Sequence, residues 1–291
     1  MTPPYMRSCT MGIYSDILLT VDFDRTLTAP DNTIPQRNLD AIRYFIANGG
    51  AFTVNTGRSS LHCGPILDKV PINTSLIVSN GAMLLENGVP TDIVSIDLPV
   101  EQTLRRICDA FPELNVDLQG IDTHFGFQPR GCWDEYHTAN RVNHLVAAPG
   151  MDYGPFIKAN IFCPLQNTSI TQMYGGAPEE IAMIDRAEQW LLDNYGHKLT
   201  VLRSQARLLS IQAPGVSKLA GARKLQKKLG KKILVCVGDA QNDIPMLDGA
   251  DYAFCPADGV IADRYPNVCC CDDGAIADVI YNELPKILTN K

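Results

Sequence analysis

Apolar positions near the start of the chain change their spacing in a regular way. Residues 17–23 are mostly apolar without alternation, as in a strand buried on both faces. Residues 35–48 then place apolar side chains on one helical stripe, with Pro35 in the first turn and Gly49 after the last. The same criteria add a strand at 51–55, a short helix at 61–70 and a strand at 75–79. This order predicts a parallel sheet with helices on its faces.

The alternation of strands and helices returns in the last third of the chain. Its elements are a helix at 217–229, a strand at 232–237, a short helix at 244–249, strands at 252–255 and 268–270, and a helix at 275–288. The middle differs, because Asn87-Gly88 between the apolar segments 83–85 and 93–96 indicates a hairpin. Its other elements are helices at 101–111 and 178–195, and strands at 116–120, 124–127, 156–162, 199–203 and 207–211. We therefore expect an α/β protein with a Rossmann-like parallel-sheet core, residues 1–83 and 209–291, and an inserted α/β unit, residues 84–208.

The composition is that of a folded globular protein, and the sequence argues against nucleic acids and membranes as partners. The chain has 291 residues, 45% hydrophobic and 20% charged, with a formal net charge of −7 and both signs interspersed. It has no basic stripe for a nucleic-acid backbone and no apolar run near the roughly 18 residues that span a membrane. Residues 1–14 lack the apolar segment of a signal peptide, and residues 1–10 are expected to be a frayed tail. Without a membrane span or a signal segment, a cytoplasmic protein is predicted. The ten cysteines lack zinc-ligand spacing and are therefore expected to be reduced. The sequence does not specify the oligomeric state.

Two acidic residues follow the first predicted strand. Asp22 and Asp24 are two positions apart, so on an extended backbone their side chains point the same way. The carboxyl edge of a parallel sheet is where such folds bind ligands. Neighbouring carboxylates repel each other and need a cation, a shared proton or different tasks. Taken alone, an Asp-x-Asp pair is more often a pair of solvated loop acids.

A second acidic loop follows the predicted strand at 232–237. In Gly238-Asp239-Ala240-Gln241-Asn242-Asp243 the acids again lie at the carboxyl end of a strand. Hard oxygen ligands from two such loops suit Mg²⁺, which takes one or two protein carboxylates and keeps several waters. The alternative is an Asx-rich turn that caps the helix from Ile244.

Two further signals concern an anion. Asn55-Thr56-Gly57-Arg58 lies at the end of the strand at 51–55 and offers a hydroxyl and backbone N–H groups beside a glycine, which suits a phosphate; a structural turn fits equally well. Lys218 lies at the N-terminus of the helix at 217–229, where the helix dipole favours anions. A lysine there is suited to holding a phosphate group, and an ordinary surface lysine is the alternative.

Together the four signals resemble the motifs of the haloacid dehalogenase-like hydrolase superfamily. The order of acid pair, Thr-Gly-Arg, Lys and Gly-Asp-x-x-Asn-Asp, each on its own sheet segment, is most similar to the Cof-type branch, which carries a large α/β cap. The resemblance covers nearly the whole core, and the inserted unit fits the cap in length and position. It implies a Mg²⁺-dependent phosphatase that acts on a small phosphorylated metabolite, with a hexose or pentose phosphate as the family-level expectation and a phosphorylated cofactor as an open alternative.

The resemblance also implies a role for each matched residue. Asp22 corresponds to the nucleophile that becomes an aspartyl-phosphate, and Asp24 corresponds to the general acid/base. The phosphate and substrate groups are Thr56, Gly57, Arg58, Lys218 and Asn242, and the metal groups are Asp22, Asp24 through its backbone carbonyl, Asp239 and Asp243. One departure is Arg25, where the family usually has glycine, which leaves the geometry of the tight loop after Asp24 open.

Two other functions remain compatible with the same motifs. A sugar phosphomutase would use the same aspartyl-phosphate and return the phosphoryl group to a second hydroxyl. A non-catalytic sensor of phosphorylated metabolites would share the site, although every reacting residue type is present. Substrate choice is expected to lie in the cap, where the polar and aromatic candidates are His124, Phe125, Arg130, Trp133, His137, Arg141, His144 and Lys158.

Overall fold

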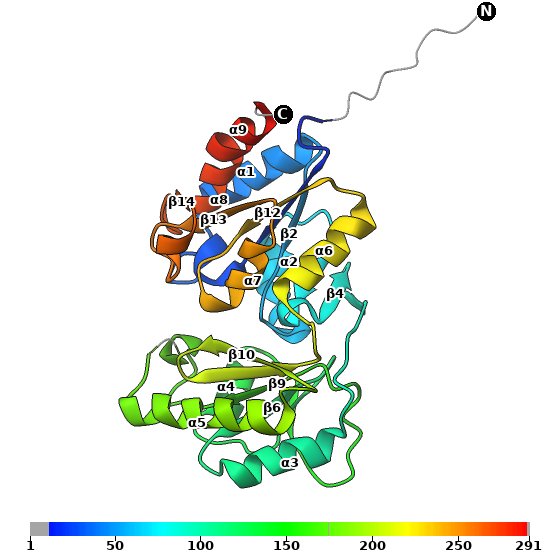
Figure 1. The fold of residues 1–291 in the computed structure, drawn as a ribbon, viewed down its shortest axis with the longest axis vertical. Coiled ribbons are helices and arrows are strands. Elements are labelled where there is room, and N and C mark those ends of the chain that lie inside the picture. The colour runs from blue at the N-terminus through cyan, green and yellow to red at the C-terminus, as the bar shows by residue number, and fades with distance from the viewer. Residues whose placement is uncertain (1–11, 174, 290–291) are drawn as a thin grey trace, which may run out of the picture.

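The computed structural model describes residues 12–173 and 175–289. These residues form a parallel-sheet core and a second α/β unit, the cap, which lies below the core in Figure 1. The N-terminal segment expected to be a frayed tail lies outside the described residues. No helix in the described part of the chain is long and apolar enough to cross a membrane.

The core sheet brings the two halves of the sequence together. Its order is β14 (Asn267–Val268), β13 (Tyr252–Pro256), β12 (Ile233–Val237), β1 (Ile17–Val21) and β2 (Ala51–Val54). All four pairings are parallel, and Val21 lies opposite Val237 at the carboxyl end of the central pair. An isolated bridge between Asn55 and Ile77 extends the sheet to β3 (Leu76–Val78). The predicted parallel sheet is confirmed.

Alternate side chains of β1 face two helical layers. Ile17, Leu19 and Val21 lie in the same buried cluster as residues of α1 (Gln36–Ala47) and α8 (Ala275–Asp278). Leu18 faces the other side, with residues of α6 (Lys218–Leu229) and α7 (Ile244–Asp248). This two-residue period, with every position buried, accounts for the mostly apolar run in the sequence. The remaining core helices are α2 (Gly64–Lys69) and α9 (Leu284–Thr289), the latter joined to α8 by a π-helical turn at Val279–Glu283.

Helix α6 is held at both ends by its own sequence. The Ser217 side chain accepts a hydrogen bond from the backbone N–H of Ala220, and Gly230 ends the helix in the left-handed conformation with φ of 63°. Asn55, which follows β2, donates its side-chain amide to the Lys218 carbonyl at 2.8 Å. The first turn of α6 is therefore fixed against the carboxyl edge of the sheet.

The cap is a six-stranded sheet with its two longest helices on the side away from the core. Its order is β10 (Thr200–Gln205), β11 (Leu208–Gln212), β9 (Lys158–Phe162), β6 (Asn115–Gln119), β7 (His124–Gly126) and β8 (His144–Val146). Helices α3 (Val100–Ala110) and α5 (Pro178–Tyr195) lie below the sheet in Figure 1, and a third helix is α4 (Trp133–Ala139). Strand β10 packs against the core segment 241–243, so the sheet faces the acidic loops.

The structure differs from the sequence prediction in a few elements. The hairpin around Asn87-Gly88 consists of β4 (Met83–Glu86) and β5 (Val89–Thr91), so its second strand is not at 93–96. The hairpin pairs with β3 of the core, and β11 pairs with β9 of the cap. The division into 1–83, 84–208 and 209–291 stays a prediction, and we propose that these pairings move its two boundaries to about 92 and 213.

Candidate active site

The acidic residues lie where the two central strands end. Asp22 follows β1, and its backbone N–H donates to the Val237 carbonyl of β12 at 2.9 Å, so it is held by the end of the strand ladder. Asp239 follows β12 two residues later. One carboxylate oxygen from each of Asp22, Asp239 and Asp243 lies within 4.8 Å of the others. Two sequence segments more than two hundred positions apart thus meet at one edge of the sheet, as the sequence predicted.

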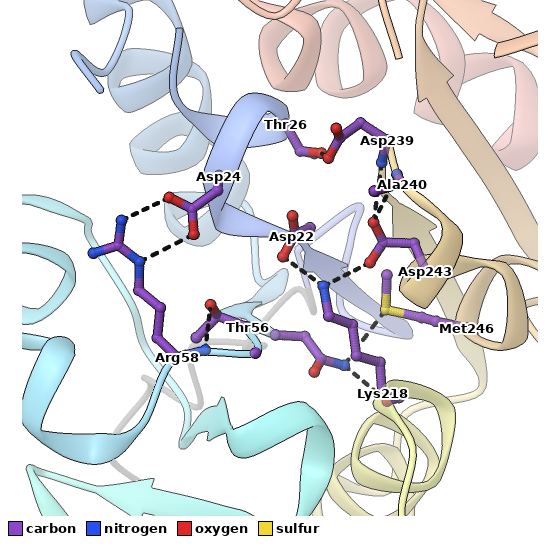
Figure 2. A network of polar contacts seen from close by, with 12 residues as sticks. Asp22, Asp24, Thr26, Thr56, Arg58, Lys218, Asp239, Ala240, Asp243 and Met246 are labelled. Atoms are coloured by element: carbon purple, nitrogen blue, oxygen red, sulfur yellow. Dashed lines mark hydrogen bonds and ion pairs between the residues drawn. The ribbon is translucent and has the colours of Figure 1, made fainter. Parts of the chain in front are cut away.

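Lys218 lies at the centre of this cluster (Figure 2). Its ammonium group donates to Asp22 Oδ1 at 2.5 Å and to Asp243 Oδ1 at 2.6 Å, and its side chain is 1% exposed. Burial alone would lower the pKa of Lys218, but the two carboxylates outweigh burial and raise it, so the lysine stays charged. The lysine is therefore an internal counter-charge, which excludes the alternative of an ordinary surface lysine.

Asp243 holds both the lysine and the acidic loop. Its Oδ2 accepts hydrogen bonds from the backbone N–H groups of Asp239 and Ala240, each at 3.1 Å, while its Oδ1 accepts from Lys218. The side chain does not cap α7. At Gly238 a Cβ atom would lie 2.6 Å from Asp243 Cγ, so glycine is needed for the loop to pass this close to the carboxylate.

Burial and mutual repulsion disfavour the charged forms of the other two acids. Burial, only partly offset by Lys218, raises the pKa of Asp22 well above its usual value. Burial and the neighbouring Asp243 raise the pKa of Asp239 to about 7, although Asp239 accepts a hydrogen bond from Thr26 Oγ1 at 2.8 Å. Three buried carboxylates face one ammonium group, so the cluster has an excess of negative charge that a cation would compensate.

Asp24 is turned toward Arg58. Figure 2 shows its carboxylate on the side away from Lys218, and the guanidinium of Arg58 binds it with two hydrogen bonds, at 2.6 and 3.0 Å. The guanidinium also lies 4.8 Å from the centre of the Phe23 ring. Burial would lower the pKa of Arg58, but Asp24 raises it, so the pair is ionic. Arg58, predicted to bind phosphate, has the acid/base candidate as its partner here.

Arg25 occupies the position where glycine is usual. Its backbone conformation explains the preference for glycine at this position. Its φ is 61° and ψ is 10°, in the left-handed region that residues other than glycine rarely adopt. The loop closes through the Arg25 N–H, which donates to Thr28 Oγ1 at 3.1 Å. The tight turn after Asp24 is thus formed with an arginine.

This conformation predicts different effects on stability for two substitutions at position 25. Arg25→Gly relieves the left-handed strain and is expected to leave the free energy of unfolding within about 1 kcal/mol of the wild type. Arg25→Val places a β-branched side chain at positive φ and is expected to destabilise the protein by a further ~1–2 kcal/mol. Urea unfolding of both variants checks the difference, and equal stabilities would contradict it.

The remaining predicted residues lie around one cleft between core and cap, with a volume of about 560 Å³. Gly57, Arg58 and Asn242 line it together with Asp22, Asp24 and Asp239. Thr56 is buried beneath them, and its hydroxyl oxygen accepts from the Arg58 N–H at 3.1 Å, which leaves its O–H to donate. The cap side is lined by Gln119, Tyr136, Lys158, Asn160, Ser204, Gln205 and Leu208.

Several residues in or next to the site had no role assigned to them from the sequence. Thr26 and Asn55 orient Asp239 and the start of α6, and both stand within the motifs themselves. Asn160 was not singled out either; it lies two positions after the cap candidate Lys158 on β9, so the two residues share the face toward the cleft. Burial lowers the pKa of Lys158 to about 7, and its ammonium donates to the Gly57 carbonyl at 2.7 Å. The alternation of polar residues along β9 is the sequence signal that could have placed both residues at the cleft.

Comparison with known proteins decides the family. The sequence profile of the haloacid dehalogenase-like hydrolases matches residues 19–260. The chain belongs to this family. A Haemophilus influenzae protein named "Putative phosphatase" is 25% identical over 236 residues, which cover 79% of this hydrolase and 80% of that protein. The predictions of the family and of a hydrolase are confirmed.

Solved structures share the fold of this hydrolase. A haloacid dehalogenase-like hydrolase from Bacteroides thetaiotaomicron has a TM-score of 0.71 at 17% identity, covering 90% of this chain and 97% of that one. A sugar phosphatase of subclass IIB of the family has a TM-score of 0.71 at 18% identity, with the same coverages. The predicted α/β architecture of core and cap is therefore confirmed.

Proposed function

We propose that this hydrolase is a Mg²⁺-dependent phosphatase that acts on a small phosphorylated metabolite, most simply a sugar phosphate, through an aspartyl-phosphate on Asp22. The observation that carries the proposal is the setting of Asp22. Its carboxylate ends the central strand, faces the cleft, and is held by a buried lysine beside a second buried acid. A nucleophile for an anionic phosphate needs this combination of fixed position and nearby positive charge. A cytoplasmic location remains a prediction.

The acidic cluster fits a divalent cation. Lys218 occupies one oxygen of Asp22, and Thr26 occupies one oxygen of Asp239, so each carboxylate has a second oxygen to offer. With the backbone carbonyl of Asp24 these are the oxygen ligands that Mg²⁺ prefers. Asp243, whose oxygens hold Lys218 and the loop, would orient these groups and balance the charge. A bound Mg²⁺ would supply positive charge at the phosphoryl oxygens.

The charges explain why both positive groups are needed. Asp22, Asp239 and Asp243 contribute about −3, and a phosphate monoester adds about −1.5 to −2 near neutral pH. At ~4 Å two like charges repel by about 4 kcal/mol at an effective dielectric constant of ~20. Lys218 and a divalent ion together contribute about +3, which offsets most of this repulsion.

The residues of the cleft can then carry out two steps. An Asp22 oxygen attacks phosphorus, the bond from phosphorus to the leaving oxygen breaks, and Asp24 gives that oxygen a proton. A water then attacks phosphorus, Asp24 takes its proton, and inorganic phosphate leaves Asp22. Lys218 and the hydroxyl of Thr56 would hold the phosphoryl oxygens. Before the first step the Asp24 carboxylate must leave its ion pair with Arg58 and take up a proton from solvent, which it then gives to the leaving oxygen.

A phosphate-release screen of the purified protein tests the proposal directly. The protein is incubated with a panel of phosphorylated metabolites, with and without Mg²⁺, and both free phosphate and isomeric sugar phosphates are measured. We expect Mg²⁺-dependent release of free phosphate, with sugar phosphates among the best substrates. Isomeric sugar phosphates without free phosphate would instead indicate a phosphomutase, and the absence of turnover across the panel would overturn the proposal.

The raised pKa of Asp239 predicts how Mg²⁺ and pH act together. In the ion-free protein, burial and Asp243 raise the pKa of Asp239 from its usual 3.8 to about 7. The contribution of Asp239 to stability is therefore fully present below about pH 4 and lost as pH rises through 7. Mg²⁺ requires the carboxylate, so the rise in Tm that it causes should grow between about pH 5.5 and 8. Differential scanning fluorimetry over this range checks the trend.

The control for this prediction is Asp239→Asn, which keeps the shape of the side chain but removes its charge. In this variant the Tm should respond little to Mg²⁺ at any pH. If the rise in Tm that Mg²⁺ causes in the wild type does not change with pH, Asp239 is not part of the ion's site.

A further inference from the structure

A second cluster of chemistry-bearing side chains lies in the cap, apart from the acidic loops. The chain has five histidines, and four of them, His62, His124, His137 and His144, form one group of ring contacts with centroids 5.2 to 6.1 Å apart. Asp117 of β6 reaches into the same group. The reaction proposed above uses none of these side chains.

Three atoms of this cluster converge on one point. His124 Nδ1 lies 3.1 Å from His137 Nε2 and 3.5 Å from Asp117 Oδ2. His137 Nε2 lies 3.9 Å from the same oxygen. A triangle with these sides has a centre about 2 Å from each corner, which is the length of a zinc–nitrogen or zinc–oxygen bond, about 2.0–2.2 Å. The three side chains are buried, with exposures of 0 to 3%.

The second polar atom of each side chain has a partner of its own. His137 Nδ1 lies 2.8 Å from the Trp133 carbonyl, so it donates and leaves Nε2 without a proton in the neutral ring. His124 Nε2 lies 2.8 Å from Ser59 Oγ, and Asp117 Oδ1 accepts from Trp133 Nε1 at 3.3 Å. Such outer contacts fix the ring tautomer and orientation in protein metal sites.

A proton between the two rings accounts less well for the geometry. It would satisfy the 3.1 Å contact, but Asp117 Oδ2 would remain 3.5 and 3.9 Å from the rings, beyond ordinary hydrogen-bond length. A buried carboxylate needs closer compensation than this. Lys158 is nearby on β9, but its ammonium donates to the Gly57 carbonyl.

We propose that Asp117, His124 and His137 bind a divalent transition-metal ion of the zinc class in the cap. Two imidazoles and one carboxylate suit zinc and similar divalent transition metals, whereas Mg²⁺ prefers oxygen ligands. This ion therefore differs from the one proposed at Asp22. Asp117 and His137 also line a small cavity of about 40 Å³, which has room for a water as a further ligand.

The ion would link two strands of the cap sheet and the short helix α4. Asp117 is on β6, His124 on β7, and His137 on the seven-residue helix α4. Through His124 the site also contacts Ser59, the core residue after Arg58. The metal therefore ties α4 to the cap sheet and sets the contact between cap and core.

Cobalt titration tests the proposal, since Co²⁺ takes zinc sites and absorbs visible light. Full-length protein is stripped with a chelator and titrated, and Zn²⁺ is then added in competition. We expect one tightly bound equivalent that Zn²⁺ displaces, without the thiolate-to-cobalt band that cysteine ligands would give. His137→Gln and Asp117→Asn should weaken binding by about 100-fold or more. No bound cobalt in the wild type, or binding unchanged in both variants, would overturn the proposal.

Two control variants separate this site from its surroundings. His144→Gln changes a neighbouring ring that pairs with Asp134 and should leave cobalt binding unchanged. Asp22→Asn should also leave it unchanged, so the outcome is independent of the proposed phosphatase reaction. If the ligand variants fail to fold, anomalous diffraction from zinc-soaked wild-type crystals decides: a peak between the three side chains supports the site, and zinc bound only elsewhere overturns it.

Discussion

Asp22→Asn is expected to abolish turnover while leaving the fold intact. The amide cannot form an acyl phosphate, so the rate should fall by about 10³-fold or more. Stability should change little, because burial already raises the pKa of Asp22 and disfavours its charged form, while Lys218 keeps Asp243 as a partner. Phosphate release and urea unfolding are measured on the same preparation. Near-normal Mg²⁺-dependent activity would remove Asp22 from the role of nucleophile.

Lys218→Met is expected to have the largest effect on stability. It leaves Asp22 and Asp243 buried without the ammonium that both contact, and breaking a buried ion pair on one side costs about 3–5 kcal/mol. The loss should shrink at lower pH, where the carboxylates take up protons, and Mg²⁺ should restore part of it. Activity should be lost as well, because the phosphoryl group loses its fixed counter-charge.

Lys158→Met is the matched control for this variant. Lys158 is also a buried lysine, but its ammonium contacts a carbonyl rather than carboxylates, and burial lowers its pKa to about 7. Its removal should cost about 1 kcal/mol or less. Similar losses for the two lysines in urea unfolding would show that the carboxylate contacts of Lys218 are not what stabilises the core.

The core and its acidic loops could be predicted because their signals are local. The apolar run of β1 ends directly at Asp22, and the strand β12 ends directly before Gly238, so strand order alone places both acids at one edge of the sheet. Lys218 likewise follows a capping serine at the start of an amphipathic helix. Each feature depends on residues within a few positions of one another.

The contacts that no local pattern predicts join distant segments. Asp24 pairs with Arg58, 34 positions away, and no sequence spacing specifies this partner. Helix α4 lacks a regular apolar stripe, since Trp133 and His137 are buried by packing on the cap rather than by a helical period. The β5 strand sits next to Asn87-Gly88 because a two-residue turn sets the register, whereas the more apolar 93–96 segment lies outside the sheet.

Trapping the phosphorylated residue tests the central claim most directly. The Asp24→Asn variant is mixed with p-nitrophenyl phosphate and Mg²⁺, because the nitrophenolate leaves without a proton while the second step lacks its base. Acid quenching and borohydride reduction convert an acyl phosphate to homoserine, which tandem mass spectrometry locates in the chain. If Asp22 is the nucleophile, homoserine is expected at position 22. Reduction at a different carboxylate, or unmodified Asp22 despite a burst of nitrophenolate, would contradict it.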